Sequence, residues 1–206
     1  MPLTVVASEI ERAPQLGGIE NDQLIGSNKN DAIRGLKGAD NIEGKSGTDL
    51  LQGNKGSDTL DGGNDQDILR GGKGNDILIG GNGDDILIGD LGQDELTGGA
   101  DADIFVLSTN PNFPNTDPNL ADIITDFNTA EGDKIGLPEN LIVQSLVLET
   151  FDSNADGSLD ATVIKLGSDS QSEVLGVVLG TVSVNGQTTL TPTDFTIIYN
   201  SLLMLS

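Results

Sequence analysis

A nine-residue repeat constrains this chain more than any other feature. From Gly17 to Val106 the sequence divides without a gap into ten nonapeptides. In all ten units position 1 is Gly, position 6 is Asp and position 8 is apolar, while position 4 is Gly in six units and position 2 in five. The position-6 aspartates are Asp22, Asp31, Asp40, Asp49, Asp58, Asp67, Asp76, Asp85, Asp94 and Asp103. Low-complexity Gly/Asp sequence would not hold three columns in phase over this length.

The spacing predicts a solenoid of stacked β-strands. Positions 7 to 9 of each unit predict a three-residue strand, with position 8 facing one side and positions 7 and 9 the other. The remaining positions predict a turn, in which glycine supplies positive φ. Strands this short bury little alone, so the units must stack with the position-8 column as their core. If two units make one coil, the rod is about 24 Å long, at roughly 4.8 Å per coil.

This stacking places the aspartates in two columns, one along each edge of the rod. One edge carries Asp22, Asp40, Asp58, Asp76 and Asp94, and the other carries Asp31, Asp49, Asp67, Asp85 and Asp103. Neighbouring carboxylates in a column, about 5 Å apart, would repel each other. A divalent cation between successive turns would reverse that repulsion, and four gaps per edge predict eight sites. Ligands that are all oxygen favour Ca²⁺ over Zn²⁺ or Cu²⁺.

Composition and charge exclude several classes of function. The net charge is −23, from 33 acidic and 10 basic residues, so neither nucleic acid nor an anionic membrane surface is an expected partner. The chain has no Cys and no His, which excludes disulfides, thiol catalysis and His metal sites. No apolar run reaches membrane-spanning length, and the N-terminal residues lack the pattern of a signal peptide. Calcium ions are the expected partners, and no membrane insertion is expected.

The repeat GGxGxDxUx resembles that of the RTX, or hemolysin-type, calcium-binding proteins. The segment ADIITDFNTAEGDKIGL (Ala121 to Leu137) is also similar to the one that follows the repeats in secreted RTX proteases. The resemblance implies an all-β fold, a right-handed parallel β-roll with Ca²⁺ in its turns. It also implies export through type I secretion machinery by an uncleaved C-terminal signal, and therefore an extracellular location.

The resemblance further implies a ligand set for each site. One turn supplies the carbonyls of positions 2 and 4 and its Asp, and the turn 18 residues later supplies the carbonyls of positions 1 and 3 and its Asp. In the later repeats these carbonyls carry over onto Asn54 and Gly56 with Gly71 and Lys73, Gly63 and Asp65 with Gly80 and Asn82, Gly72 and Gly74 with Gly89 and Leu91, and Gly81 and Gly83 with Gly98 and Ala100. The first two repeats lack Gly at position 4, so their sites are expected to be weak or absent.

Residues 107–206 predict a C-terminal, mostly antiparallel β region that caps the roll and contains the possible secretion signal, and residues 1–16 predict an N-terminal cap or arm. Within the C-terminal region, Asp152, Asn154, Asp156, Ser158 and Asp160 match the spacing of a calcium loop, but apparent strands flank them. They predict either a calcium loop at a hairpin tip or an acidic turn. Asp122, Asp126 and Asp133 predict either a last ion site or a solvated edge.

The function these features favour is a secreted calcium-binding module without enzymatic activity, whose roll folds on binding about eight Ca²⁺. A surface, adhesive or glycan-binding protein built on the same roll is the alternative, and an enzyme is less favoured because no HExxH or GxSxG motif is present. Even-numbered repeats carry an apolar outward stripe at Ile68, Ile86, Ile88 and Ile104. This stripe should be covered by the C-terminal region or, in a homo-oligomer, by a second subunit.

Overall fold

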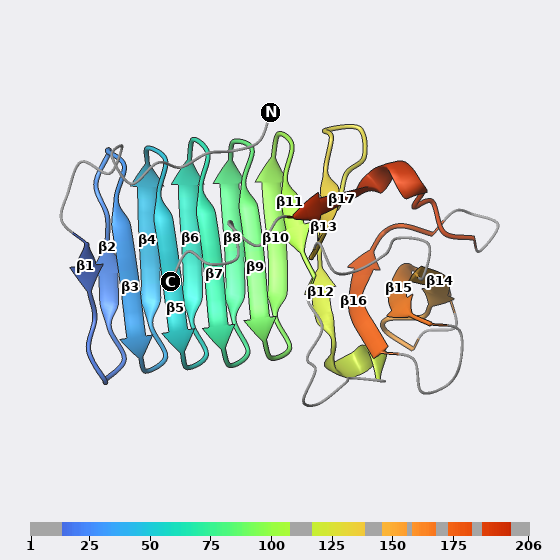
Figure 1. Ribbon diagram of the computed structural model, residues 1–206, viewed down its shortest axis with the longest axis horizontal. Coiled ribbons are helices and arrows are strands. Elements are labelled where there is room, and N and C mark those ends of the chain that lie inside the picture. The colour runs from blue at the N-terminus through green and yellow to red at the C-terminus, as the bar shows by residue number, and fades with distance from the viewer. Residues whose placement is uncertain are drawn as a thin grey trace.

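The computed structural model describes residues 14–107, 117–138, 146–155, 158–167, 173–182 and 187–198. Alternate repeats enter alternate sheets, so the chain winds as a parallel β-roll (Figure 1). The first sheet, sheet A, has the strand order β1-β3-β5-β7-β9-β11-β13-β17. The second, sheet B, has the order β14-β15-β16-β12-β10-β8-β6-β4-β2. The predicted all-β solenoid is therefore confirmed.

The strands of the roll are longer than the repeat predicted. Sheet A contains β1 (Gln15–Leu16), β3 (Ala32–Lys37), β5 (Leu50–Lys55), β7 (Ile68–Lys73), β9 (Ile86–Leu91) and β11 (Ile104–Val106), and sheet B contains β2 (Gln23–Ile25), β4 (Asn41–Ser46), β6 (Thr59–Asn64), β8 (Ile77–Asn82) and β10 (Glu95–Ala100). Most span six residues, positions 7 to 9 of one unit and positions 1 to 3 of the next. Positions 2 and 3 still pair in register with the next coil, as Leu36 does with Asn54, so the turn shortens to positions 4 to 6.

The core is the predicted position-8 column. Leu24 at the N-terminal end is 7% exposed, and the other nine side chains of the column, from Ile33 to Phe105, are fully buried. Residues 18 apart pair directly in both sheets, for example Leu51 with Leu69. Each coil therefore stacks its apolar side chain on the equivalent side chain of the coil before it.

The coil continues past the last repeat. Strand β12 (Asp122–Ile124) pairs in parallel with β10, and β13 (Lys134–Pro138) pairs in parallel with β11. Ile124 lies beside Leu96, and Ile135 lies beside Phe105, so both extend the position-8 core. Residues 117–125 and 128–136 thus act as two further units of the roll, although neither begins with Gly. The roll does not end at residue 106.

In the described part of the C-terminal region, antiparallel pairing joins three strands, apart from an isolated bridge between Val182 and Thr188. The strands are β14 (Leu146–Phe151), β15 (Ala161–Leu166) and β16 (Glu173–Leu179), and they lie at the C-terminal end of the roll (Figure 1). β16 then joins β12 in parallel, and β17 (Phe195–Ile198) joins β13 in parallel. Two short 3₁₀ helices, Pro118–Leu120 and Pro192–Asp194, complete the described elements, and neither has the length to cross a membrane.

The outer face of sheet A carries a second apolar cluster. It consists of Ile68, Ile86, Ile88, Val106 and Ile198, with Leu50 and Ile104 partly buried against it. The predicted burial of the even-repeat face is therefore confirmed, with Ile86 only 3% exposed. This burial arises within one chain and does not require a second subunit. On sheet B, by contrast, Ile77 and Ile79 remain exposed.

Candidate metal centre

The two aspartate columns form as predicted, and a ladder of hydrogen bonds connects each column. From Asp40 to Asp103, the Oδ1 atom of each position-6 aspartate accepts the backbone N–H of the aspartate 18 residues earlier. Asp40 accepts from Asp22 at 2.8 Å, and Asp103 accepts from Asp85 at 2.9 Å. One carboxylate oxygen of each of these eight aspartates therefore faces the preceding coil.

The second carboxylate oxygen, Oδ2, is left without a partner in most of the roll. In the part of the chain that the structure describes, it is buried and unbonded in eight aspartates: Asp40, Asp49, Asp58, Asp67, Asp76, Asp85, Asp94 and Asp103. None of these eight residues is more than 2% exposed. Burying a carboxylate oxygen without a donor is costly, and so many unpartnered acceptors in register fit a cationic ligand.

The surroundings of Gly62 show where Oδ2 points. A Cβ atom built on Gly62 would lie 2.5 Å from Oδ2 of Asp67 and 2.7 Å from the carbonyl oxygen of Gly80 in the next coil. Both oxygens therefore border one space, which glycine leaves open. Oδ1 of Asp85 enters the same gap, where it accepts the N–H of Asp67 at 2.8 Å. Oδ2 thus faces the coil that follows.

Backbone carbonyls complete the same gap. A Cβ built on Gly83 would lie 2.5 Å from the carbonyl oxygen of Asp65, and one built on Gly81 would collide with the carbonyl oxygen of Gly63. The carbonyls of positions 2 and 4 therefore point toward the following coil, as the ligand scheme requires. Among the described residues, no group of three or more acidic side chains is placed to hold a metal ion by side chains alone. Two carboxylates with several carbonyls form a hard, all-oxygen donor set, which fits Ca²⁺.

Electrostatics of the buried aspartates point to the same deficit of positive charge. Burial, with neighbouring aspartates adding to it, raises the pKa of Asp67 to about 9 and that of Asp103 to about 8. Burial also raises the pKa values of Asp49, Asp76 and Asp85 to about 7. The hydrogen bond from the preceding coil opposes this shift without cancelling it. A divalent cation in the gap would restore the ionised form.

The first two turns are built differently. Oδ2 of Asp22 accepts the N–H of Gly18 at 2.6 Å, and Oδ2 of Asp31 accepts both the N–H and the hydroxyl of Ser27 at 2.7 Å. Positions 2 and 4 have positive φ in all eight later repeats but at none of these positions in the first two. The two turns that the sequence marked as weakest are thus the two whose carboxylates are already satisfied.

Comparison with known proteins agrees with this geometry. A family model described as the RTX calcium-binding nonapeptide repeat (four copies) matches residues 16–51, 43–78 and 79–108. Residues 16–108 are an array of RTX calcium-binding repeats. No curated protein matches the chain. A solved structure, the solution structure of the AlgE6R3 subunit from the Azotobacter vinelandii mannuronan C5-epimerase, is similar with 21% identity and a TM-score of 0.36, over 91% of this chain and 83% of that one.

The predicted calcium loop outside the RTX roll lies at a hairpin tip. It connects β14 to β15, whose last and first residues, Phe151 and Ala161, are register partners. Asp160 accepts the N–H of Ser153 at 2.8 Å and its hydroxyl at 3.0 Å, and these bonds hold the pKa of Asp160 below its usual value. Asp156 lies outside the described residues. Ser153 donates to both oxygens of the Asp160 carboxylate, so this carboxylate does not call for a cation. Metal binding at this loop stays a prediction.

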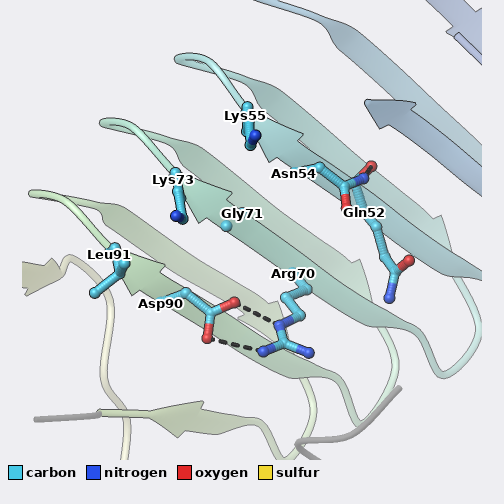
Figure 2. Close-up of a pocket in the computed structure, with 9 residues that line it drawn as sticks. Gln52, Asn54, Lys55, Arg70, Gly71, Lys73, Asp90 and Leu91 are labelled. Atoms are coloured by element: carbon cyan, nitrogen blue, oxygen red, sulfur yellow. Dashed lines mark hydrogen bonds and ion pairs between the residues drawn. The ribbon is translucent and has the colours of Figure 1, made fainter. Parts of the chain in front are cut away.

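A pocket of about 390 Å³ lies on the outer face of sheet A, a feature that the sequence analysis missed (Figure 2). β5, β7 and β9 line it, with Arg70 paired to Asp90 across two neighbouring strands. Lys55 and Lys73 lie along its rim, and Lys37 precedes Lys55 in the same register. These three lysines recur every 18 residues at position 3, so the repeat itself carried the signal.

Proposed function

We propose that this chain is an extracellular calcium-binding RTX module without catalytic activity, whose roll folds when Ca²⁺ fills the gaps between its turns. The observation that carries the proposal is the set of eight buried Oδ2 atoms without partners. The calcium-binding repeat family supports the choice of ion. The proposed stoichiometry is eight ions, one for each open Oδ2.

In each gap, both side chains and backbone would supply ligands to the ion. In the best-defined gap, Asp67 and Asp85 would supply carboxylate oxygens, and Asp65 and Gly80 would supply carbonyls. Calcium would provide the positive charge that two buried, facing carboxylates lack. Because ligands from two coils must meet around one ion, binding is coupled to the stacking of coils, and binding free energy becomes folding free energy.

Calcium-free protein should therefore be largely unfolded, at near-neutral pH and low ionic strength. Circular dichroism during a titration from EGTA into millimolar Ca²⁺ should report the cooperative appearance of β structure. Mg²⁺ should induce it poorly, because Mg²⁺ demands tighter octahedral geometry and holds its water. A roll that is fully folded in excess EGTA, or that folds equally well with Mg²⁺, would contradict the proposal.

A second candidate function, binding of an anionic polysaccharide, is favoured by the lysine row on sheet A. Lys37, Lys55 and Lys73 are all exposed and stack one per coil on a chain whose net charge is −23. A row of cations at about 4.8 Å spacing matches a polymer with one acidic group per sugar better than an extended peptide, whose same-side groups recur at about 6.8 Å.

The test uses calcium-loaded protein and a sulfated polysaccharide, with its desulfated form as the reference. The triple variant Lys37→Gln, Lys55→Gln, Lys73→Gln should lose binding that depends on sulfation. Lys45→Gln is the matched control, because Lys45 lies in β4 of the opposite sheet. Equal retention of wild type and triple variant on the sulfated matrix would eliminate this candidate.

A further inference from the structure

The series of gaps does not end at the last repeat. Asp94 and Asp103 belong to the final two repeats, and their Oδ1 atoms accept N–H groups from Asp76 and Asp85 in the preceding coil. Their Oδ2 atoms are buried and unpartnered, and each residue is 1% exposed. Because Oδ2 in this roll faces the following coil, these two atoms open toward a segment that contains no RTX repeat.

The backbone of these two turns has the open conformation too. Asp90 and Gly92 in the first turn have positive φ, as do Gly99 and Asp101 in the second. Positive φ at positions 2 and 4 occurs in the same eight turns whose Oδ2 is unpartnered. Each of the last two turns therefore presents the same half of a site as the turns before it.

The following coil supplies the other carboxylate. Oδ1 of Asp122 accepts the N–H of Asp94 at 3.1 Å, and Oδ1 of Asp133 accepts the N–H of Asp103 at 3.0 Å. The strand bonds are equally regular, since Ile123 N–H donates to the Asp94 carbonyl at 2.8 Å. Asp122 is 6% exposed and Asp133 is 2% exposed. Chain separations of 28 and 30 residues thus give the geometry that 18 residues give inside the repeats.

We infer that the segment after the repeats completes two further calcium sites, one between Asp94 and Asp122 and one between Asp103 and Asp133. This inference rests on the proposed function. It also shifts the eight sites toward the C-terminal end of the roll, relative to the eight gaps between repeats that the sequence predicts. The gaps after Asp22 and Asp31 drop out because their Oδ2 atoms are satisfied, so six sites lie between repeats and two lie beyond them.

Charge around the two outer gaps agrees with a cation there. Burial and the facing Asp94 carboxylate hold the pKa of Asp122 well above its usual range, and burial raises that of Asp133. Asp126 adds a third carboxylate near Asp103 and Asp133, and its two oxygens accept the N–H groups of Gly98 and Gly99 at 2.9 and 2.8 Å. A proton or a cation must offset this buried negative charge.

The test counts ions bound per chain by equilibrium dialysis with radioactive calcium at saturation. Wild type should bind eight. The double variant Asp122→Asn, Asp133→Asn should bind six, because Asn keeps an Oδ1 acceptor for the ladder hydrogen bond but removes the charge. The control Asp22→Asn, Asp31→Asn should still bind eight. Circular dichroism in saturating calcium checks that each variant is folded.

The outcomes separate this inference from the proposed function. A wild type that binds no calcium refutes the proposed function itself. A wild type that binds calcium, together with an unchanged count in the Asp122/Asp133 variant, overturns only the two outer sites. Loss of two ions in the Asp22/Asp31 control would also overturn the shifted set. Should the double variant fail to fold, each single variant is expected to bind seven ions, and a count of eight in both would overturn the inference.

Discussion

The first two turns of the roll and the eight that follow carry the same aspartate but use it in different ways. In the first two, Asp22 and Asp31 accept hydrogen bonds from position 2 of their own turn. In the next eight, that second oxygen is buried and unbonded. The aspartate column alone therefore does not define a calcium site. The backbone conformation at positions 2 and 4 decides whether the carboxylate satisfies itself or remains available for an ion.

Several of the open turns hold that conformation without glycine. Leu36, Lys45 and Asn54 occupy position 2 with φ of 80°, 89° and 77°. A left-handed conformation costs a non-glycine residue about 1–2 kcal/mol, and Asn tolerates it better than Leu or Lys. Such conformations persist only where the surroundings enforce them, and they cluster at ligand sites. The strain occurs in turns whose Oδ2 is unpartnered and is absent from the first two turns. This difference fits ion binding in the former and capping of the roll in the latter.

The largest effect that separates the two kinds of turn should come from removing one aspartate from each. Asp76→Ala removes an oxygen from two gaps, since Oδ1 faces the coil of Asp58 and Oδ2 faces that of Asp94. We expect its calcium midpoint for folding to rise about tenfold or more, which corresponds to about 1.4 kcal/mol or more. Asp22→Ala should shift the midpoint by less than twofold. Equal calcium midpoints for the two variants in circular dichroism titrations would show that the two kinds of turn do not differ in calcium binding.

The pH dependence of the calcium-free protein should be the next largest effect. Burial raises the pKa of Asp67 to about 9 and that of Asp103 to about 8 in the folded state, whereas the pKa of an unfolded Asp is about 3.9. The folded state thus binds more protons, and its stability falls as pH rises from about 4 to about 9. In EGTA, the roll should be more folded at pH 5 than at pH 9.

Saturating calcium provides the control for that experiment. Protons and calcium compete for the same carboxylates, so the calcium midpoint should rise as pH falls. Asp67→Asn should also flatten the pH dependence in EGTA, because it removes a group whose pKa burial raises to about 9. Circular dichroism measures both, through calcium titrations at each pH and through the folded fraction in EGTA across the pH range. A calcium-free roll that gains stability from pH 5 to pH 9 would contradict this account.

The repeat predicted much of the fold because its columns correspond directly to structural roles. Position 8 predicted the core from Leu24 to Phe105, and the 18-residue period predicted both sheets and both aspartate columns. The two added coils were missed because residues 107–116 and 126–127 interrupt the period and because Asp117 and Asn128 replace the glycine of position 1. Hydrogen bonds in the structure reveal them, and these bonds involve Asp122 and Asp133, which the sequence offers as candidate ligands.

The structure of the first two turns was only partly predictable, for a different physical reason. The missing glycine at position 4 predicted weak sites, but not the hydrogen bonds that replace the ion. Ser27 can close its turn because its hydroxyl and N–H both reach Asp31, which is typical of serine in local turns. In the hairpin loop, Ser153 does the same for Asp160. Ligand spacing alone does not reveal such internal donors.

The smallest and sharpest test of the comparison substitutes glycine at position 2 in one turn of each kind. Leu36→Gly relieves a positive φ of 80° on a side chain that is 38% exposed, and the relief of about 1–2 kcal/mol exceeds the entropy cost of glycine, about 0.5–1 kcal/mol. Ser27→Gly removes the hydroxyl bond to Asp31 at 2.7 Å, worth about 1 kcal/mol, and relieves no strain. The same substitution toward the repeat consensus should therefore stabilise the calcium-loaded roll by a few tenths to about 1 kcal/mol at position 36 and, because the glycine entropy cost adds to the lost bond, destabilise it by about 1.5–2 kcal/mol at position 27. Urea denaturation in saturating calcium measures both, and two changes of the same sign would show that the two kinds of turn do not differ in this way.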